Sequence, residues 1–163
     1  MVEVELDQTE EWGEDRDWQA LADAAVAQAF VVAGFATNAN VSISITLSNN
    51  DEVQALNAQW RDKNKPTNVL SFPMLEAEDL AALAATGKGV ALLGDIILAH
   101  TVCVAEAEEK GIALPDHVTH LIIHGTLHLL GYDHIDDIQA EHMEALEVKA
   151  LASLGLGNPY SDN

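Results

Sequence analysis

Eleven residues, His124 to His134, constrain this chain more than any other stretch. They read His-Gly-Thr-Leu-His-Leu-Leu-Gly-Tyr-Asp-His, which places histidines at i, i+4 and i+10. The apolar run before them predicts a helix, on which His124 and His128 lie one turn apart on the same face. Gly131 predicts the end of that helix, because glycine adopts the left-handed conformation without strain at Cβ. The chain can then turn back and bring His134 towards the other two histidines.

This spacing predicts a catalytic metal site. Imidazole nitrogens of His124 and His128 can converge on one ion at about 2.0–2.1 Å, and His134 can supply a third ligand. Three protein ligands leave the fourth position for water, which is the pattern of a catalytic zinc. His120 and His124 form a second i, i+4 pair, but only the 124/128 pair has the turn and the third histidine in place. We therefore interpret His120 as a core residue or one that supports a ligand, and His117 as a solvated residue of the first helical turn.

Length and composition predict one globular domain spanning residues 1–163. The chain has 163 residues and 48% of them are apolar, enough for a sizeable core. No run reaches the roughly 18 apolar residues that a membrane span needs, and the acidic N-terminus lacks the basic start of a signal peptide. The single cysteine, Cys103, lies in an apolar helical pattern and is expected to be a buried, inert thiol. We expect a cytoplasmic protein with no membrane contact.

The charge of the chain limits which substrates it can bind. Net charge is −20, with 27 acidic residues against seven Lys and Arg. Phosphate binding is driven by basic residues that release counterions, so a general nucleic-acid binder is disfavoured. However, Arg61, Lys63 and Lys65 place three of the seven basic residues close together. An acidic surface with one basic spot remains compatible with a polyanionic substrate at that spot.

Periodicity predicts an α/β (α+β) fold: a single-domain sandwich of a four-stranded mixed sheet and about five helices, one of them the zincin-like histidine helix. Pro73 limits one strand, as expected at a sheet edge. The last helix is expected to run from about Asp136 to Leu154, with an apolar stripe that includes Ile138 and Met143. The strands are predicted over residues 1–6, 41–47, 68–72 and 92–98.

Residue 125 separates two possible chemistries of such a site. Zinc lowers the pKa of bound water to about 7, so hydroxide is available for attack on a carbonyl or phosphoryl centre. Metzincin peptidases share this spacing of histidines and glycine, but a glutamate follows their first histidine and serves as the general base. Here that residue is Gly125, which cannot take a proton. An RNA phosphodiester has less need of that glutamate, because the metal and the guanidinium of Arg61 can both stabilise charge on the non-bridging oxygens.

These residues resemble the YbeY family, metal-dependent endoribonucleases of ribosomal RNA maturation. The histidine block looks like the signature of the family, residues 56–73 are similar to its second block, and residues 93–97 to its third. The likeness extends from the helix near Asp51 to Tyr160. By resemblance, His124, His128 and His134 are the ligands of one Zn²⁺ ion, and Arg61 is the catalytic or substrate-orienting arginine.

The resemblance implies a single-strand-specific endoribonuclease that acts in 16S ribosomal RNA maturation, especially at the 3′ end, and in ribosome quality control. The ribosome or ribosomal proteins are further expected partners. Lys63 and Lys65 either hold substrate phosphates or are solvated loop lysines. Asp133 either accepts a hydrogen bond from a ligand histidine or caps the last helix. Two alternatives stay open: a zinc hydrolase of peptides or small esters, and a non-catalytic ribosome assembly factor whose metal holds the fold.

Overall fold

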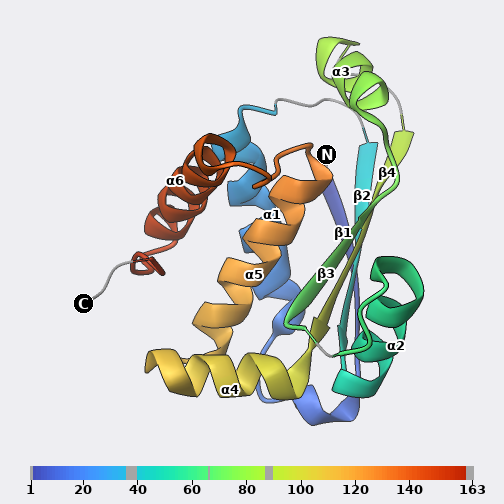
Figure 1. Cartoon of the computed structure of the whole chain (residues 1–163). Helices are drawn as coiled ribbons and strands as arrows, with labels where there is room; N and C mark the ends of the chain where they lie inside the picture. The colour runs from blue at the N-terminus through green and yellow to red at the C-terminus, as the bar shows by residue number, and fades with distance from the viewer. Residues whose placement is uncertain (1, 36–39, 66, 87–89, 161–163) are drawn as a thin grey trace.

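The computed structural model describes residues 2–35, 40–65, 67–86 and 90–160, so Met1 of the first predicted strand lies outside it. In this part of the chain the strands form one four-stranded sheet in the order β1-β2-β4-β3 (Figure 1). The strands β1, β2 and β4 are parallel, and β3 pairs antiparallel with β4 at the edge. The predicted mixed sheet is therefore confirmed. The strands are β1 (Val2–Gln8), β2 (Asn40–Ser48), β3 (Val69–Pro73) and β4 (Val90–Ala99).

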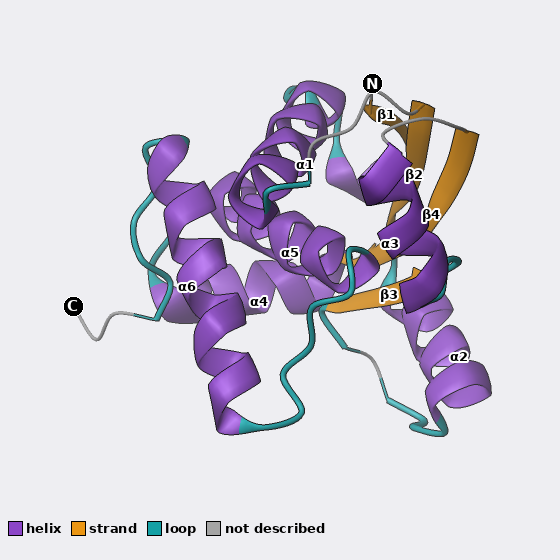
Figure 2. Cartoon of the chain, turned by 90° about the horizontal axis from the view of Figure 1, so that it is seen from above, coloured by secondary structure: helices purple, strands orange, loops and turns teal. Residues whose placement is uncertain are grey.

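Helices cover both faces of this sheet (Figures 1 and 2). Helices α1 and α5 pack on one face, α6 packs on the outer side of these two helices, and α2 packs on the opposite face. The described residues contain six α-helices and a short 3-10 turn, Glu10–Trp12. The helices are α1 (Trp18–Ala33), α2 (Asn50–Arg61), α3 (Ala77–Thr86), α4 (His100–Lys110), α5 (Leu114–Leu129) and α6 (Asp137–Ser153).

The residue pattern explains why these elements form. Every second residue of β2 is buried, so the alternation in the sequence places its apolar side chains in the core under α1 and α5. Asn49 begins α2 by accepting a hydrogen bond from the backbone N–H of Glu52 at 2.8 Å. Asp136 begins α6 in the same way, through the N–H of Gln139 at 2.8 Å. No helix in the described part of the chain has both the length and the apolar character needed to cross a bilayer.

One residue of α6 departs from the sequence-based expectation. Ile138 was expected on the inner stripe of α6, but its side chain is 79% exposed, whereas Met143 is buried as predicted. Helix α5 is buried on nearly all sides because it is enclosed by α1, α4, α6 and the sheet. This enclosure holds the histidine-bearing end of α5 against the edge strand β3.

Strand β4 has a bulge where it lies very close to the edge strand β3. The pairing of β2 with β4 shifts between Ser42 and Ile43, so that Leu93 is an extra residue before Gly94. Gly94 has a φ of +152°, and a Cβ there would lie 2.3 Å from the carbonyl oxygen of Phe72. The backbone of β3 therefore occupies the volume that any side chain at position 94 would need.

Cys103 is expected to resist thiol reagents in the folded chain. Its side chain is buried in α4, and burial, reinforced by the charge of Glu106, raises its pKa to about 12. The reactive thiolate is therefore scarce at neutral pH and out of reach. Iodoacetamide at pH 7.5, followed by mass spectrometry, should leave the native chain unmodified and label it once in concentrated urea. Rapid labelling of the native chain would contradict the burial of this thiol.

Candidate metal centre and groove

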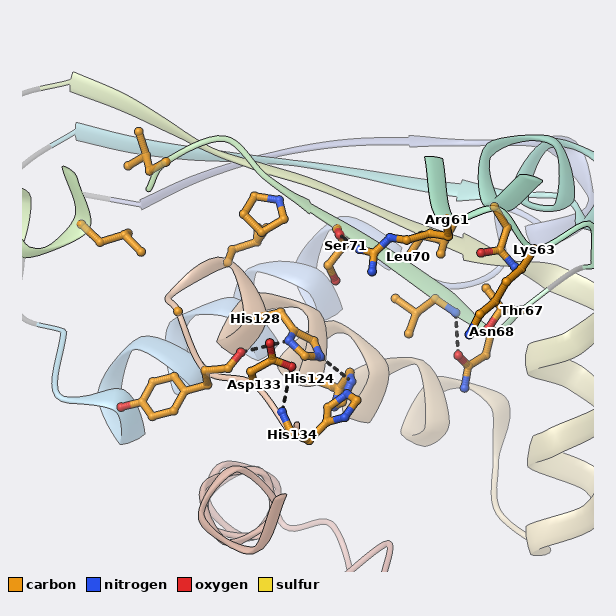
Figure 3. Close-up of a pocket in the computed structure, with 18 of the residues that line it drawn as sticks. Arg61, Lys63, Thr67, Asn68, Leu70, Ser71, His124, His128, Asp133 and His134 are labelled. Carbon is orange, nitrogen blue, oxygen red and sulfur yellow. Dashed lines mark hydrogen bonds between the residues drawn. The ribbon is translucent and has the colours of Figure 1, made fainter. Parts of the chain in front are cut away.

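The three predicted ligand histidines come together at the end of α5. His124 and His128 lie on its last two turns, Gly131 follows with a φ of +100°, and the chain turns back to His134. The Nε2 atoms of His124 and His128 are 3.1 Å apart. One nitrogen from each of the three rings lies within 4.8 Å of the others, so this group could hold a metal ion (Figure 3).

Hydrogen bonds turn two of these rings so that their Nε2 atoms face each other. The Nδ1 of His128 donates to the carbonyl oxygen of Tyr132 at 3.0 Å, and the Nδ1 of His124 donates to Glu147 at 3.2 Å. Since a carbonyl and a carboxylate only accept, neutral rings carry their protons on Nδ1 and present Nε2 lone pairs to one another. Two nitrogens bound to one tetrahedral zinc are about 3.3 Å apart. The donor set therefore fits a cation between the rings.

The environment also favours the metal-binding form of His128. Burial, together with the neighbouring rings of His124 and His134, lowers the pKa of His128 to about 4. The ring is thus neutral at physiological pH, and no proton has to leave before it binds a metal.

Glu147 is a residue of this site that the sequence analysis missed. It lies on α6, and its Oε1 accepts hydrogen bonds from His120 at 2.7 Å and from His124 at 3.2 Å. Burial raises the pKa of Glu147, but the hydrogen bonds from the two histidines outweigh burial and bring it below its usual range. A signal was present in the sequence: Glu147 lies four residues after Met143 and four before Leu151, on the apolar stripe of its helix. The interpretation of His120 as a buried supporting residue agrees with this contact.

His117 was expected to be solvated, and this expectation is wrong. Its side chain is 1% exposed, and its Nε2 pairs with Glu106 on α4 at 2.9 Å. Burial is the main reason that the pKa of His117 is lowered. The helix turns this histidine towards α4 rather than solvent because α4 packs along the first turns of α5.

Asp133 does not cap the last helix, since Asp136 has that role. Its carboxylate instead accepts a hydrogen bond from the backbone N–H of His134 at 2.8 Å. This contact shapes the turn that presents the His134 ring, and Asp133 lines the groove beside it. Asp133 therefore supports a ligand histidine, as one of the two expectations held, but it does so by a hydrogen bond from the main chain of His134 and not from its ring.

A groove of about 870 Å³ joins the histidines to the basic spot. Arg61, Lys63 and Lys65 line it together with His124, His128 and His134. Figure 3 shows Arg61, Lys63 and the three histidines. The Nη2 of Arg61 donates to the carbonyl oxygen of Ser71 at 2.7 Å, and its guanidinium lies 5.7 Å from the centre of the Phe72 ring. Strand β3 therefore holds this guanidinium on the wall of the groove while its remaining N–H donors stay available.

Gly125 lies where α5 touches the sheet. A Cβ at this position would lie 3.0 Å from the Oγ of Ser71 and 3.1 Å from two side-chain atoms of Ile96. The position after the first histidine is thus packed against β3 and β4. Replacing Gly125 with glutamate would push against the side chains of Ser71 and Ile96.

Fold and site together define a class: a metal-dependent hydrolase with a three-histidine centre in an open, partly basic groove. Comparison with known proteins gives the family. The family model described as Endoribonuclease YbeY matches residues 3–155, and the chain belongs to this family.

Individual relatives agree with the assignment. An endoribonuclease YbeY of Zymomonas mobilis is 55% identical, over all of this chain and 95% of that protein. One of Sphingopyxis alaskensis is 51% identical over 99% of both chains. A Thermotoga maritima protein with a known solution structure superposes with a TM-score of 0.57 at 25% identity, covering 94% of this chain and 89% of the other.

Proposed function

We propose that this chain is a zinc-dependent endoribonuclease that cleaves single-stranded ribosomal RNA in the cytoplasm, with residues 1–163 as one functional domain. Its substrates would include the 3′ end of 16S ribosomal RNA, in maturation and in ribosome quality control, with the ribosome or its proteins as partners. The observation that carries this proposal is the shared groove: in a chain of net charge −20, three of seven basic residues line the same cavity as the three histidines. The names of the relatives support an RNA substrate.

The proposed roles follow from the positions of the side chains. His124, His128 and His134 would hold the ion, which when bound supplies Lewis-acid chemistry that makes hydroxide available at neutral pH. Arg61 would stabilise the phosphate that is attacked, because a guanidinium makes bidentate contacts to phosphate oxygens. Its bond to Ser71 uses one donor, and the residue lines the groove. Lys63 and Lys65 would hold neighbouring phosphates as point charges.

The alternatives are less well supported by the site. A peptidase would need a general base after the first histidine, and Gly125 is packed against Ser71 and Ile96 instead. A purely structural metal would have to join parts of the fold, but the three ligands lie in one short segment, 124–134, beside a continuous apolar core. Removing the ion with a chelator should therefore abolish cleavage and leave the circular dichroism spectrum intact. Loss of the fold together with the ion would favour the non-catalytic assembly factor.

Replacing Arg61 is expected to reduce cleavage without reducing zinc binding. For Arg61→Ala we expect cleavage of a single-stranded 16S 3′-end fragment to fall by about 100-fold or more, the size of effect seen when one donor to a developing anion is lost. Arg61→Lys should recover little of this loss, because an ammonium lacks the planar fork. Zinc content should equal that of the wild type, since Arg61 contacts Ser71 and Phe72 and none of the histidines.

The matched control is Arg16→Ala, which removes the same charge from an exposed position outside the groove. It should cleave like the wild type. The same fragment annealed to a complementary strand should be cut more slowly. If Arg61→Ala cleaves as fast as Arg16→Ala, Arg61 has no part in the mechanism. If the single-stranded and the annealed fragment are cleaved at the same rate, single-strand specificity is contradicted.

A further inference from the structure

Glu147 is an unusual residue for this acidic chain. Among the described residues it is the one acidic side chain that is buried, with 1% of its surface exposed. A carboxylate is expensive to bury unless it is paired and hydrogen-bonded. Glu147 meets this requirement entirely with groups from other parts of the chain: α5 and the segment after α6.

A single oxygen of Glu147 accepts three hydrogen bonds. The donors to Oε1 are the Nε2 of His120 at 2.7 Å, the Oη of Tyr160 at 2.9 Å and the Nδ1 of His124 at 3.2 Å. His120 and Tyr160 do not belong to the three-histidine group, whereas His124 does. The carboxylate thus links a ligand ring to two residues behind it.

The contact with Glu147 determines which nitrogen of the His124 ring is available to bind a metal. Because its Nδ1 donates to a carboxylate, its Nε2 is left as an acceptor and is aimed at the Nε2 of His128, 3.1 Å away. Carboxylates in this position orient a ligand imidazole and raise its basicity, which strengthens metal binding. A fixed negative charge next to the ring also favours a cation on its other side.

Tyr160 connects the end of the chain to the same carboxylate. The backbone N–H of Tyr160 donates to Asn158 at 2.8 Å, which shapes the turn, and its ring meets His120 edge-on at 5.5 Å. Burial and the adjacent carboxylate raise the pKa of Tyr160, so the phenol stays protonated and donates. Tyr160 lies beyond residues 3–155, the part that the family model matches.

From this geometry we infer that Glu147 is a positioning residue for the metal centre, and that Tyr160 anchors the carboxylate and thereby couples the C-terminal segment to metal retention. The inference rests on the proposed function only in that the three histidines hold the ion. Breaking the Tyr160 contact would loosen Glu147, and a looser Glu147 would orient His124 less well.

Metal affinity tests this coupling directly and does not depend on RNA cleavage. The full chain is stripped of metal, and the zinc dissociation constant is measured by competition with a chromogenic chelator. We expect Glu147→Gln to weaken zinc binding by about 10- to 100-fold and Tyr160→Phe, which keeps the ring, by about 3- to 10-fold. The matched control is Glu141→Gln, at an exposed position on the same helix α6. It removes the same charge without removing a hydrogen bond to a histidine, and its affinity should stay within about twofold of the wild type.

Each outcome is informative. If Glu147→Gln or Tyr160→Phe binds zinc as tightly as Glu141→Gln, and only the stability of the zinc-free chain falls, the role is purely structural and the inference is wrong. If Glu147→Gln does not fold, the zinc dissociation constant of Tyr160→Phe alone tests the inference. If affinity falls as expected but no RNA is cut by the wild type, the positioning role holds and the proposed function fails. A wild-type chain that binds no zinc would overturn both.

Discussion

His128→Ala is expected to abolish both zinc retention and RNA cleavage, the largest functional effect of any single substitution proposed for this chain. His128 supplies the Nε2 that faces His124 at 3.1 Å, and this nitrogen is free of a proton because the neutral ring carries its proton on Nδ1, which donates to the Tyr132 carbonyl oxygen. Removing it leaves one ligand on α5 and one on the exposed turn. We expect zinc affinity to fall by more than about 100-fold, beyond the 10- to 100-fold loss typical of residues that only orient a ligand.

Metal content after dialysis, measured by mass spectrometry, and cleavage of the single-stranded fragment test this expectation. The control is His142→Ala, which removes a histidine on α6 that packs against Tyr132 and is no member of the three-histidine group. It should keep its zinc and its activity. The helix itself should tolerate His128→Ala, since alanine is the best helix former. Full zinc occupancy and normal cleavage in His128→Ala would mean that the reaction takes place elsewhere.

Gly94→Ala is expected to have the largest effect on stability. A Cβ at this position would lie 2.3 Å from the backbone oxygen of Phe72 and 2.7 Å from the Cδ2 of Leu129. The backbone oxygen cannot move aside without breaking the pairing of β3 with β4. Strain at a positive φ and overpacking each cost about 1–3 kcal/mol, so we expect the free energy of unfolding to fall by about 2–6 kcal/mol.

Urea denaturation of the zinc-free chain measures this loss. Gly111→Ala is the matched control, because Gly111 also has a positive φ, +68°, but no atom within 4 Å of an added Cβ. Only the backbone penalty of about 1–2 kcal/mol applies there. Equal losses for the two variants would show that the close approach of β3 to β4 does not constrain position 94.

Much of the fold could be predicted because local patterns determine it. The alternation in β2 and the glycine after α5 each depend on neighbouring residues, and each was located correctly. The same is true of the three histidines, whose spacing within eleven residues is enough to bring them together. Strand order and the position of α6 depend on packing between distant segments, so periodicity could not determine them.

The errors concern residues whose partners are far away in the sequence. His117 was assigned to solvent because its partner, Glu106, lies on another helix. Glu147 was overlooked because its contacts are with α5 and with Tyr160. Ile138 fits the period of the α6 stripe but precedes the part of the helix that packs on the core. In each case the long-range contact, rather than the local pattern, decides burial.

The tight contact at Gly125 has a consequence for how this scaffold can evolve. A peptidase descendant would need a carboxylate at that position, and the side chains of Ser71 and Ile96 would have to give way by a few tenths of an ångström to admit its Cβ. These two residues are paired neighbours on β3 and β4, so the sheet surface beneath the two helical ligands would have to repack at the same time. Side-chain packing under α5 therefore works against the peptidase route, and altered substrate preference should arise along the groove walls instead.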